Sequence, residues 1–242
     1  MKLALLGHGA MGQLVERLAR EAGDEVATVL GSREAAFGAE ELAEILAGHD
    51  AAIDFTVADA VARHAEACAL ARVPLVEGTT GWHAQLDDVR RVFEREGGAL
   101  IYGANFSVGV NLFYRVVARA AELFKGFDYA AFVEEAHHSR KRDAPSGTAL
   151  RLRDILTDAY GAGPPVASTR AGHIPGTHRV GFDSAADHIT LTHTARSREG
   201  FASGALVAAR WIRGKAGVYE FSETLEEILK GREPQGDESD ER

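Results

Sequence analysis

The sequence predicts an α/β protein in which a parallel-sheet domain is followed by a second, α+β domain. Over the first hundred or so residues, short apolar runs alternate with helical patterns, which indicates a parallel sheet with helices on both faces. A glycine-rich loop follows the first apolar run and opens the first helical pattern. The rhythm changes after Asn105, where a long helical pattern begins the second region.

The elements of the first region follow from residue spacing. Short apolar runs predict strands at Lys2–Leu6, Glu25–Leu30, Ala51–Phe55, Pro74–Glu77 and Ala99–Tyr102. Apolar residues at helical spacing predict the intervening helices, Met11–Glu21, Ala39–Leu46, Ala58–Ala71 and Leu86–Glu96.

The second region reads differently, with longer helices and fewer strands. Helices are expected at Leu112–Phe124, Ala149–Ala159, Ala202–Ile212 and Ser222–Leu229. Strands are expected at Tyr129–Ala136 and His188–His193, with a loop at Gly161–Pro165. From about residue 231 the chain is polar and acidic, which is typical of a disordered tail.

The composition excludes several classes of protein. The 242 residues carry a formal net charge of −9, which argues against a general nucleic-acid or anionic-membrane partner. The chain has no 18-residue apolar run, so no membrane span is expected. Its single cysteine, Cys68, cannot form an internal disulfide and fits a reducing compartment. We therefore expect a cytoplasmic protein.

The glycine loop indicates a dinucleotide site. Gly7, Gly9 and Gly12 have G-x-G-x-x-G spacing between the first strand and the first helix. Gly7 would permit the tight turn, Gly9 the approach of a pyrophosphate, and Gly12 close packing of helix on strand. The helix dipole would favour the phosphate, so we predict a Rossmann-like, nicotinamide-dinucleotide domain.

The end of the second strand bears on the choice of cofactor. A carboxylate there would favour NADH through the ribose hydroxyl, whereas an arginine would accommodate the 2′-phosphate of NADPH. Ser32 and Arg33 follow the strand directly, and no carboxylate stands at its end. NADPH is therefore favoured, with NADH as the alternative because Glu34 lies within reach.

Two further loops fall at the carboxyl ends of predicted strands, where open α/β sheets bind ligands. The first contains Gly78, Thr79 and Thr80, whose small side chains and hydroxyls suit a nicotinamide or its ribose. The second is Gly103–Ser107. Taken singly, each loop is equally compatible with an ordinary turn.

A cationic segment precedes the helix near residue 149. His137, His138 and Lys141 lie in a His-His-Ser-Arg-Lys-Arg run. Ser146 is a good N-cap, and free backbone N–H groups near Gly147 and Thr148 would then form an anion site. The arrangement suits a dicarboxylate, and His137 and Lys141 could supply protons to an atom that receives hydride.

Three other interpretations of this segment are weaker. Neighbouring histidines on a strand point to opposite faces, and no third ligand follows at useful spacing, so no metal site is expected. The basic run is short in an acidic chain, which disfavours a nucleic-acid patch. A solvated loop would explain the charges, but not the helix start beside them.

The segment strongly resembles the 4-hydroxy-tetrahydrodipicolinate reductase family, also called dihydrodipicolinate reductases. The resemblance rests on E-A-H-H-x-x-K-x-D-A-P-S-G-T-A at Glu135–Ala149, and it covers nearly the whole chain. The other matching motifs are G-T-T-G (Gly78–Gly81), A-N-F-S-V-G-V-N-L (Ala104–Leu112), R-A-G-H-I-P-G (Arg170–Gly176) and H-T-A-R-S-R-E-G-F-A-S-G-A (His193–Ala205). The loop before the first helix is one residue shorter than the family's usual G-x-x-G-x-M-G, although Met11 and Gly12 align.

The resemblance implies reduction of a cyclic dicarboxylate, with loss of water, by NADPH or NADH on the diaminopimelate route to lysine. It implies His137 as the acid/base residue and Lys141 as a proton donor. The substrate carboxylates would be held by His138, Ser146, Gly147 and Thr148. The cofactor would contact Gly7, Gly9, Met11, Gly12, Ser32, Arg33, Gly78, Thr79, Thr80, Ala104, Asn105 and Phe106.

The resemblance also implies a domain division and an assembly. Residues 1–107 and 199–242 would form a discontinuous dinucleotide-binding domain, and residues 108–198 a substrate-binding domain whose sheet assembles a homotetramer. Two rival functions remain at this point. One is a related two-domain dehydrogenase acting on a small amino acid such as aspartate, and the other is a catalytically inactive sensor that binds the cofactor.

Overall fold

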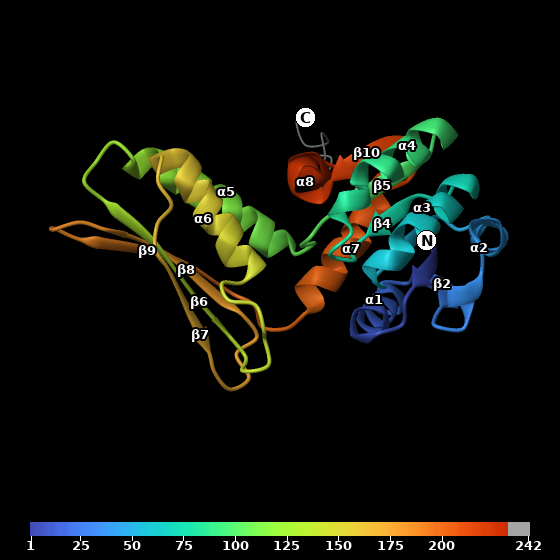
Figure 1. Ribbon diagram of the computed structural model, residues 1–242, viewed down its shortest axis with the longest axis horizontal. Coiled ribbons are helices and arrows are strands. Elements are labelled where there is room, and N and C mark those ends of the chain that lie inside the picture. The colour runs from blue at the N-terminus through green and yellow to red at the C-terminus, as the bar shows by residue number, and fades with distance from the viewer. Residues whose placement is uncertain (232–242) are drawn as a thin grey trace, which may run out of the picture. The chain divides into compact units, whose positions relative to one another are not determined.

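A six-stranded parallel sheet organises the first unit of the computed structural model, which describes residues 1–231 (Figure 1). Its strands lie in the order β10 (Gly217–Glu220), β5 (Ala99–Tyr102), β4 (Leu75–Glu77), β3 (Ala51–Asp54), β1 (Lys2–Leu6) and β2 (Glu25–Leu30). Strands β3, β4 and β5 are buried along their whole length, as expected for parallel strands covered on both faces. The predicted Rossmann-like fold class is confirmed.

Helices cover this sheet. Those of the first unit are α1 (Ala10–Glu21), α2 (Ala39–Leu46), α3 (Ala58–Leu70), α4 (Leu86–Glu96), α7 (Glu199–Ile212) and α8 (Phe221–Lys230). Side chains of α2, α3 and α4 share one core cluster with β1, β3, β4 and β5, so these helices lie on one face. From β1 to β2 the chain moves toward one edge of the sheet, whereas from β2 through β3 and β4 to β5 it moves toward the other edge. Right-handed crossovers therefore place α1 on the face opposite to that of α2, α3 and α4.

A four-stranded mixed sheet forms the second unit. Its order is β7 (Val166–Arg170), β6 (Ala130–His137), β8 (Thr177–Asp183) and β9 (His188–Thr194), with β6 and β7 parallel and the other pairs antiparallel. Helices α5 (Val108–Phe124) and α6 (Gly147–Tyr160) pack on one face around a core that includes Val133, Leu152 and Phe182. The two helices lie together on this face in Figure 1.

Alternation along β9 shows how the two faces of this sheet differ. Ile189 and Leu191 pack against the core, whereas Thr190 and Thr192 are exposed. A strand with a period of two in burial has one face toward a core and the other free of it. Across the described residues of this unit, no helix covers the second face.

Three strands and two short 3₁₀ helices were not anticipated from the sequence. Strand β7 reads Val-Ala-Ser-Thr-Arg and β10 reads Gly-Val-Tyr-Glu, and neither sequence contains an apolar run. Strand β8 contains Gly181, where an added Cβ would lie 2.2 Å from the ring of Phe132. The 3₁₀ helices are Glu34–Ala36 and His83–Gln85.

The two compact units are Met1–Ser107 with the described chain from Phe201, and Val108–Gly200. The tail predicted to be disordered lies outside the described residues, apart from Gly231. No helix within residues 1–231 combines the length and apolar composition that crossing a membrane requires.

Gly204 in α7 provides a test of the packing in the first unit. A Cβ added there would lie 1.7 Å from the carbonyl oxygen of Phe106, a backbone atom that cannot rotate away. We expect Gly204→Ala to lower the free energy of unfolding by about 1–3 kcal/mol in urea titrations followed by circular dichroism. The control Gly126→Ala has no neighbour within 4 Å and should stay within about 0.5 kcal/mol. Equal midpoints for the two variants would contradict this packing.

Candidate active site

The glycine loop makes a tight turn between β1 and α1. Gly7 has φ +90°, and a Cβ there would lie 2.6 Å from the carbonyl oxygen of Phe55. A Cβ at Gly12 would lie 2.1 Å from the carbonyl oxygen of Gly7. Larger residues are therefore excluded from both positions, and the loop closes tightly onto the start of the helix.

The N-terminus of α1 is open. Gly9 is the N-cap, no side chain caps it, and no atom lies within 4 Å of the place where its Cβ would be. The first backbone N–H groups of a helix have no partner within the helix, and they carry the positive end of its dipole. This open start fits the pyrophosphate of a dinucleotide, as the spacing of the glycines predicts.

The end of β2 lies beside this loop, because the Gly7 N–H donates to the Leu30 carbonyl oxygen at 2.8 Å. Ser32 and Arg33 are exposed there. The carboxylate of Glu34 accepts a hydrogen bond from the Gly31 N–H at 2.8 Å. Glu34 is thus engaged by the turn itself, while Arg33 is available at the surface.

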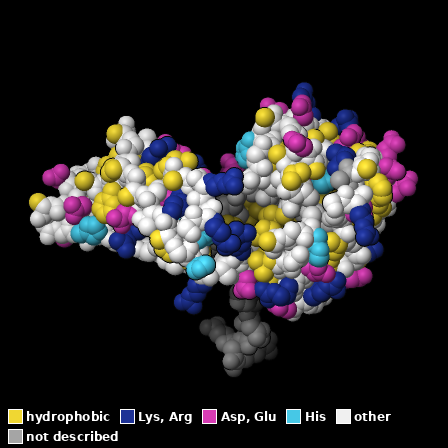
Figure 2. All heavy atoms as spheres, turned by 60° about the horizontal axis from the view of Figure 1, so that its bottom comes forward, with side chains coloured by type: hydrophobic (Ala, Val, Ile, Leu, Met, Phe, Trp, Pro, Cys, Tyr) yellow, Lys and Arg dark blue, Asp and Glu magenta, His cyan; other side chains and the backbone are white. Residues whose placement is uncertain are grey.

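An apolar pocket of about 160 Å³ lies at the carboxyl edge of the sheet. It is lined by Met11, Phe55, Gly78, Gly103, Ala104, Phe106 and Phe201. On the face drawn in Figure 2, apolar side chains are exposed within a hollow of the larger, first unit. Pockets for flat organic rings are lined mainly by apolar and aromatic groups, and this one fits a nicotinamide.

The pocket brings together only part of the predicted cofactor set. Thr80 is exposed and Asn105 is half-buried; neither lines the pocket. Thr79 is buried, and its hydroxyl accepts from the Thr56 N–H at 3.0 Å and donates to Asp54 at 3.3 Å. The Thr79 hydroxyl therefore holds the loop rather than pointing to a ligand.

Two buried carboxyl groups lie beneath this loop. Asp54 and Glu77 are both 0% exposed, and Asp54 Oδ2 lies 2.7 Å from Nδ1 of His64. The Thr79 N–H donates to Glu77 Oε1 at 2.7 Å. Burial, and then the charge of Asp54, raise the pKa of Glu77 well above its usual value. Burial thus favours the uncharged form of Glu77 beside the charge of Asp54 under the cofactor loop.

The cationic segment begins at the end of β6. His137 is the last residue of the strand and is buried, whereas His138 directly follows it and is half-buried. The Lys141 N–H donates to the His138 carbonyl oxygen at 3.0 Å. The Lys141 ammonium pairs with Asp143 at 2.8 Å and is 24% exposed, so its charge stands at the surface of the site.

Helix α6 starts as the sequence predicts, with Ser146 as its N-cap. The Ser146 hydroxyl accepts from the Ala149 N–H at 3.3 Å and lies 3.1 Å from Nε2 of His178. Ser146 is 2% exposed, so its side chain stabilises the start of the helix and is not free to contact a ligand. Gly147 is exposed, with no atom near its Cβ position. The N–H groups of Gly147 and Thr148 are thus placed for an anion, while Ser146 itself is not.

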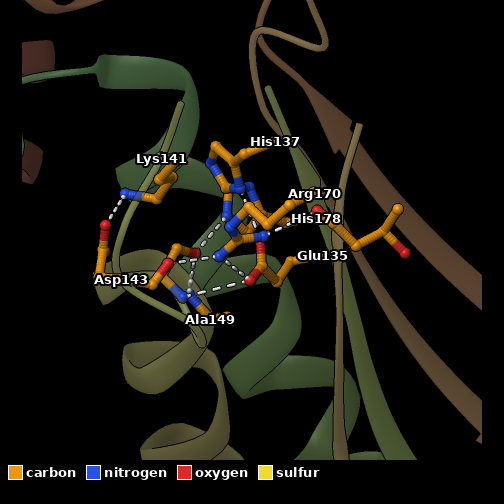
Figure 3. A network of polar contacts seen from close by, with 9 residues as sticks. Glu135, His137, Lys141, Asp143, Ala149, Arg170 and His178 are labelled. Atoms are coloured by element: carbon orange, nitrogen blue, oxygen red, sulfur yellow. Dashed lines mark hydrogen bonds and ion pairs between the residues drawn. The ribbon is translucent and has the colours of Figure 1, made fainter. Parts of the chain in front are cut away.

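A buried carboxylate, Glu135, ties these elements together (Figure 3). It accepts two hydrogen bonds from Arg170, 2.6 Å to Oε1 and 2.9 Å to Oε2. Nδ1 of His137 makes a very short contact with Oε2, and the Ser146 N–H donates to Oε1 at 3.3 Å. Burial alone would raise the pKa of Glu135, but the hydrogen bonds from Arg170, Ser168 and His137 lower it to about 2.

Burial favours the neutral form of two histidines, His137 and His178. Burial lowers the pKa of His137 and outweighs the opposing effect of Glu135. Burial, followed by the nearby His137, lowers the pKa of His178 to about 4. The two rings meet edge to face with centroids 5.1 Å apart.

Glu135, His137 and His178 place donor atoms within 4.8 Å of one another, a set that could hold a metal ion. The sequence analysis considered only the neighbouring pair His137 and His138. The other two possible metal ligands, Glu135 and His178, come from other positions in the sheet. Arg170 already neutralises the carboxylate, and Nε2 of His178 faces the Ser146 hydroxyl. The carboxylate of Glu135 is thus fully engaged, whereas Nδ1 of His178 is buried without a hydrogen-bond partner, and the expectation of no metal stays a prediction.

Several site residues escaped the sequence analysis. Phe55 is the last residue of the predicted strand Ala51–Phe55 and directly follows the observed β3, so the rule that selected the loop at Gly78 applies equally to it. Glu135 lies two residues before His137, and alternation along a strand puts both on one face. Arg170 and Phe201 lie in motifs of the family resemblance but were given no role there, and His178 lies outside every motif.

An open helix start beside an apolar pocket in one unit, and a helix start preceded by histidines and a lysine in the other, fit the class of nicotinamide-dependent oxidoreductases. The chain belongs to the dihydrodipicolinate reductase family. Residues 1–106 match the N-terminal part of that family, and residues 109–225 match its C-terminal part.

Relatives in sequence agree with this assignment. The 4-hydroxy-tetrahydrodipicolinate reductase of Christiangramia forsetii is 35% identical over 95% of this chain and 100% of its own length. That of Anaeromyxobacter dehalogenans strain 2CP-1 is 38% identical over 77% of this chain and 76% of its own.

Solved structures share the fold. A dipicolinate-bound dihydrodipicolinate reductase from Paenisporosarcina sp. TG-14 superposes with a TM-score of 0.72 at 20% identity, covering 91% of this chain and 97% of that one. A DAP dehydrogenase of C. glutamicum reaches 0.52 at 13% identity, covering 96% and 99%. Because dehydrogenases of other kinds share the architecture, the family follows from the sequence match.

His178 should make the stability of the protein depend on pH. Its pKa is about 4 in the folded protein against an ordinary value of 6.5, so between these values the unfolded chain takes up a proton that the folded protein refuses. The free energy of unfolding should therefore fall as the pH drops through this window, and His178→Gln should reduce the fall.

Urea titrations at about pH 7.5 and about pH 5 measure this loss. The exposed His188 on β9 provides the control, and His188→Gln should lose as much stability as the wild type. A loss in His178→Gln as large as in the wild type would show that His178 is not held neutral.

Proposed function

We propose that this chain is a 4-hydroxy-tetrahydrodipicolinate reductase on the diaminopimelate route to lysine. It reduces a cyclic dicarboxylate, with loss of water, to tetrahydrodipicolinate. The observation that carries the proposal is the placement of His137 and Lys141 before the start of α6, in a chain of this family. The relatives from C. forsetii and A. dehalogenans bear the name of this activity, and the Paenisporosarcina enzyme holds dipicolinate, also a cyclic dicarboxylate.

Charge explains why a dicarboxylate suits this site. The N–H groups of Gly147 and Thr148 and the positive end of the α6 dipole attract one carboxylate. His138 and the ammonium of Lys141 attract the other. The Ser146 side chain serves the proposal indirectly, because it caps the helix and so fixes where those N–H groups point.

Proton transfer is the second task of these residues. After loss of water the substrate is a conjugated cyclic imine, and its reduction requires a hydride at a ring carbon and a proton. When bound, the reduced nicotinamide supplies the hydride. The proton comes from the Lys141 ammonium, or from His137 once its Nε2 has taken one up, and their position beside the anion site places them where negative charge develops.

The proposed cofactor site lies in the first unit. Gly7, Gly9, Met11 and Gly12 would hold the pyrophosphate at the start of α1. The nicotinamide would occupy the apolar pocket at Gly78, Ala104 and Phe106, bordered by Thr80 and Asn105, while Thr79 holds the loop from within. We propose NADPH as the preferred cofactor, because Arg33 is exposed at the end of β2 whereas Glu34 is engaged by Gly31.

We propose a homotetramer that acts in the cytoplasm. The face of the second sheet that carries Thr190 and Thr192 is free of helices among the described residues, and it offers a surface for another copy of this chain. The one cysteine, Cys68, is a buried free thiol, which fits a reducing compartment.

Oxidation of NADPH by the purified protein tests the activity, with the substrate made in situ from pyruvate and aspartate semialdehyde by the preceding synthase. We expect substrate-dependent oxidation, and we expect His137→Ala and Lys141→Ala each to lower kcat by about 10²–10⁴-fold.

The exposed residues His188 and Lys125 serve as controls, and their alanine variants should retain wild-type rates. Turnover within about threefold of wild type for both His137→Ala and Lys141→Ala would refute the roles given to these residues. No oxidation with either cofactor, from a folded protein that binds them, would favour the amino-acid dehydrogenase or the sensor.

Arg33 should decide the cofactor preference. Replacing it with alanine removes the charge that would meet the 2′-phosphate, so the ratio of kcat/KM for NADPH to that for NADH should fall about tenfold or more. The exposed Arg91 on α4 provides the matched control, and Arg91→Ala should leave the ratio unchanged. An unchanged ratio in Arg33→Ala would exclude Arg33 from cofactor selection.

A further inference from the structure

Glu135 is placed to act on His137 without contacting the substrate. Its side chain is fully buried, at 0% exposed. Both oxygens are used within the protein, Oε1 by Arg170 and the Ser146 N–H, and Oε2 by Arg170 and Nδ1 of His137. Any effect of Glu135 on the reaction must therefore pass through one of these partners.

The contact with Nδ1 determines where His137 carries its proton. A neutral imidazole has one N–H, on Nδ1 or on Nε2, and an ionised carboxylate can only accept a hydrogen bond. The two hydrogen bonds from Arg170 keep Glu135 ionised. The N–H of neutral His137 must therefore be at Nδ1, which leaves Nε2 to exchange protons.

The surroundings of Nε2 agree with this assignment. Gly176 packs beside the ring with φ +142°, and a Cβ added there would lie 3.1 Å from Nε2 of His137. Any larger residue would crowd the nitrogen on the side away from Glu135. The glycine thus keeps space free beside the nitrogen that the carboxylate leaves available.

We propose that Glu135, held ionised by Arg170, is the positioning residue of His137: it fixes the tautomer with the proton on Nδ1 and leaves Nε2 for proton exchange with the substrate. The proposal rests on the proposed function, because it assigns His137 a proton transfer. Turnover would then depend also on Glu135 and Arg170, two residues that act through His137 and do not contact the substrate.

Four charged or titratable groups face the His137 ring. They are Glu135 on the same strand, Lys141 in the following loop, Arg170 at the end of β7 and His178 on β8. Of these, Glu135 alone favours the charged imidazole, since the other three are cationic or become so on protonation. Loss of the Glu135 charge should therefore lower the pKa of His137 further.

The test replaces both partners together, because removing one would leave an uncompensated buried charge. The variant Glu135→Met/Arg170→Met replaces both charged groups with apolar side chains and takes away the acceptor at Nδ1. The matched control is Glu134→Met/Arg179→Met, which removes the neighbouring, exposed ion pair of 3.0 Å between β6 and β8.

Nitrogen-15 spectra of protein labelled in the histidine rings report the tautomer directly, with His137→Asn to assign the signals. We expect neutral His137 to carry its proton on Nδ1 in the wild type and the control, and mainly on Nε2 in Glu135→Met/Arg170→Met. A proton on Nδ1 in all three proteins, or on Nε2 in the wild type, would overturn the proposal.

Kinetics give the second readout. In Glu135→Met/Arg170→Met, kcat should fall at least about tenfold with KM within about threefold, whereas the control should match the wild type. If the double variant does not fold, Glu135→Leu/Arg170→Leu serves instead, since it also removes both charges and the acceptor, and it should show the same kcat loss and a lower pKa of His137 in the ring spectra. An unchanged kcat in the folded variant would refute the role of Glu135.

The ring spectra require no turnover, so the two proposals can fail separately. A wild type that lacks reductase activity but shows the predicted tautomer would reject the proposed function alone. An active wild type whose tautomer does not respond to Glu135 would reject the positioning role alone.

Discussion

The ion pair between Glu135 and Arg170 is the constraint on which the second unit's site depends. A buried ion pair is stable only when its desolvated atoms are fully hydrogen-bonded, and here every carboxylate oxygen has two donors. Arg170 also donates to the Asp143 carbonyl oxygen at 2.6 Å. The pair thereby joins the end of β6, the end of β7, the cationic loop and the start of α6. It also cancels the negative charge of Glu135, which would otherwise repel an anionic substrate at the neighbouring helix start.

The two units prepare a helix N-terminus for an anion in different ways. Helix α1 starts at Gly9 without a side-chain cap, so its first N–H groups are left for a ligand. Helix α6 has Ser146, which satisfies the Ala149 N–H and leaves those of Gly147 and Thr148. The uncapped start suits a cofactor that supplies its own phosphates, whereas the capped start fixes a smaller site beside groups that transfer protons.

Much of the fold could be predicted because its elements carry strong local patterns. Strands such as Lys2–Leu6 and Ala99–Tyr102 are apolar runs buried on both faces, and their bounds agree with the structure. Strands β7 and β10 could not be predicted, since hydrogen bonds to neighbouring strands define them and their residues do not. The same distinction applies to the residues of the site. The family motif includes His137 and Lys141, but two residues that surround His137, Arg170 and His178, lie more than thirty residues after it in the chain. The fold class and the family resemblance are confirmed, and the roles of individual site residues stay predictions.

Calorimetric titration with dipicolinate, the ring dicarboxylate held by the Paenisporosarcina enzyme, tests the central claim most directly. The claim is that the start of α6 and the cationic groups before it form a site for two carboxylates. With NADPH present, we expect one dipicolinate per chain, and at least about tenfold weaker binding of picolinate, which lacks one carboxylate. Thr148→Pro, which removes an N–H from the helix start, should weaken dipicolinate as well. Equal affinity for the two ligands, or no binding of dipicolinate by the folded protein, would contradict the account.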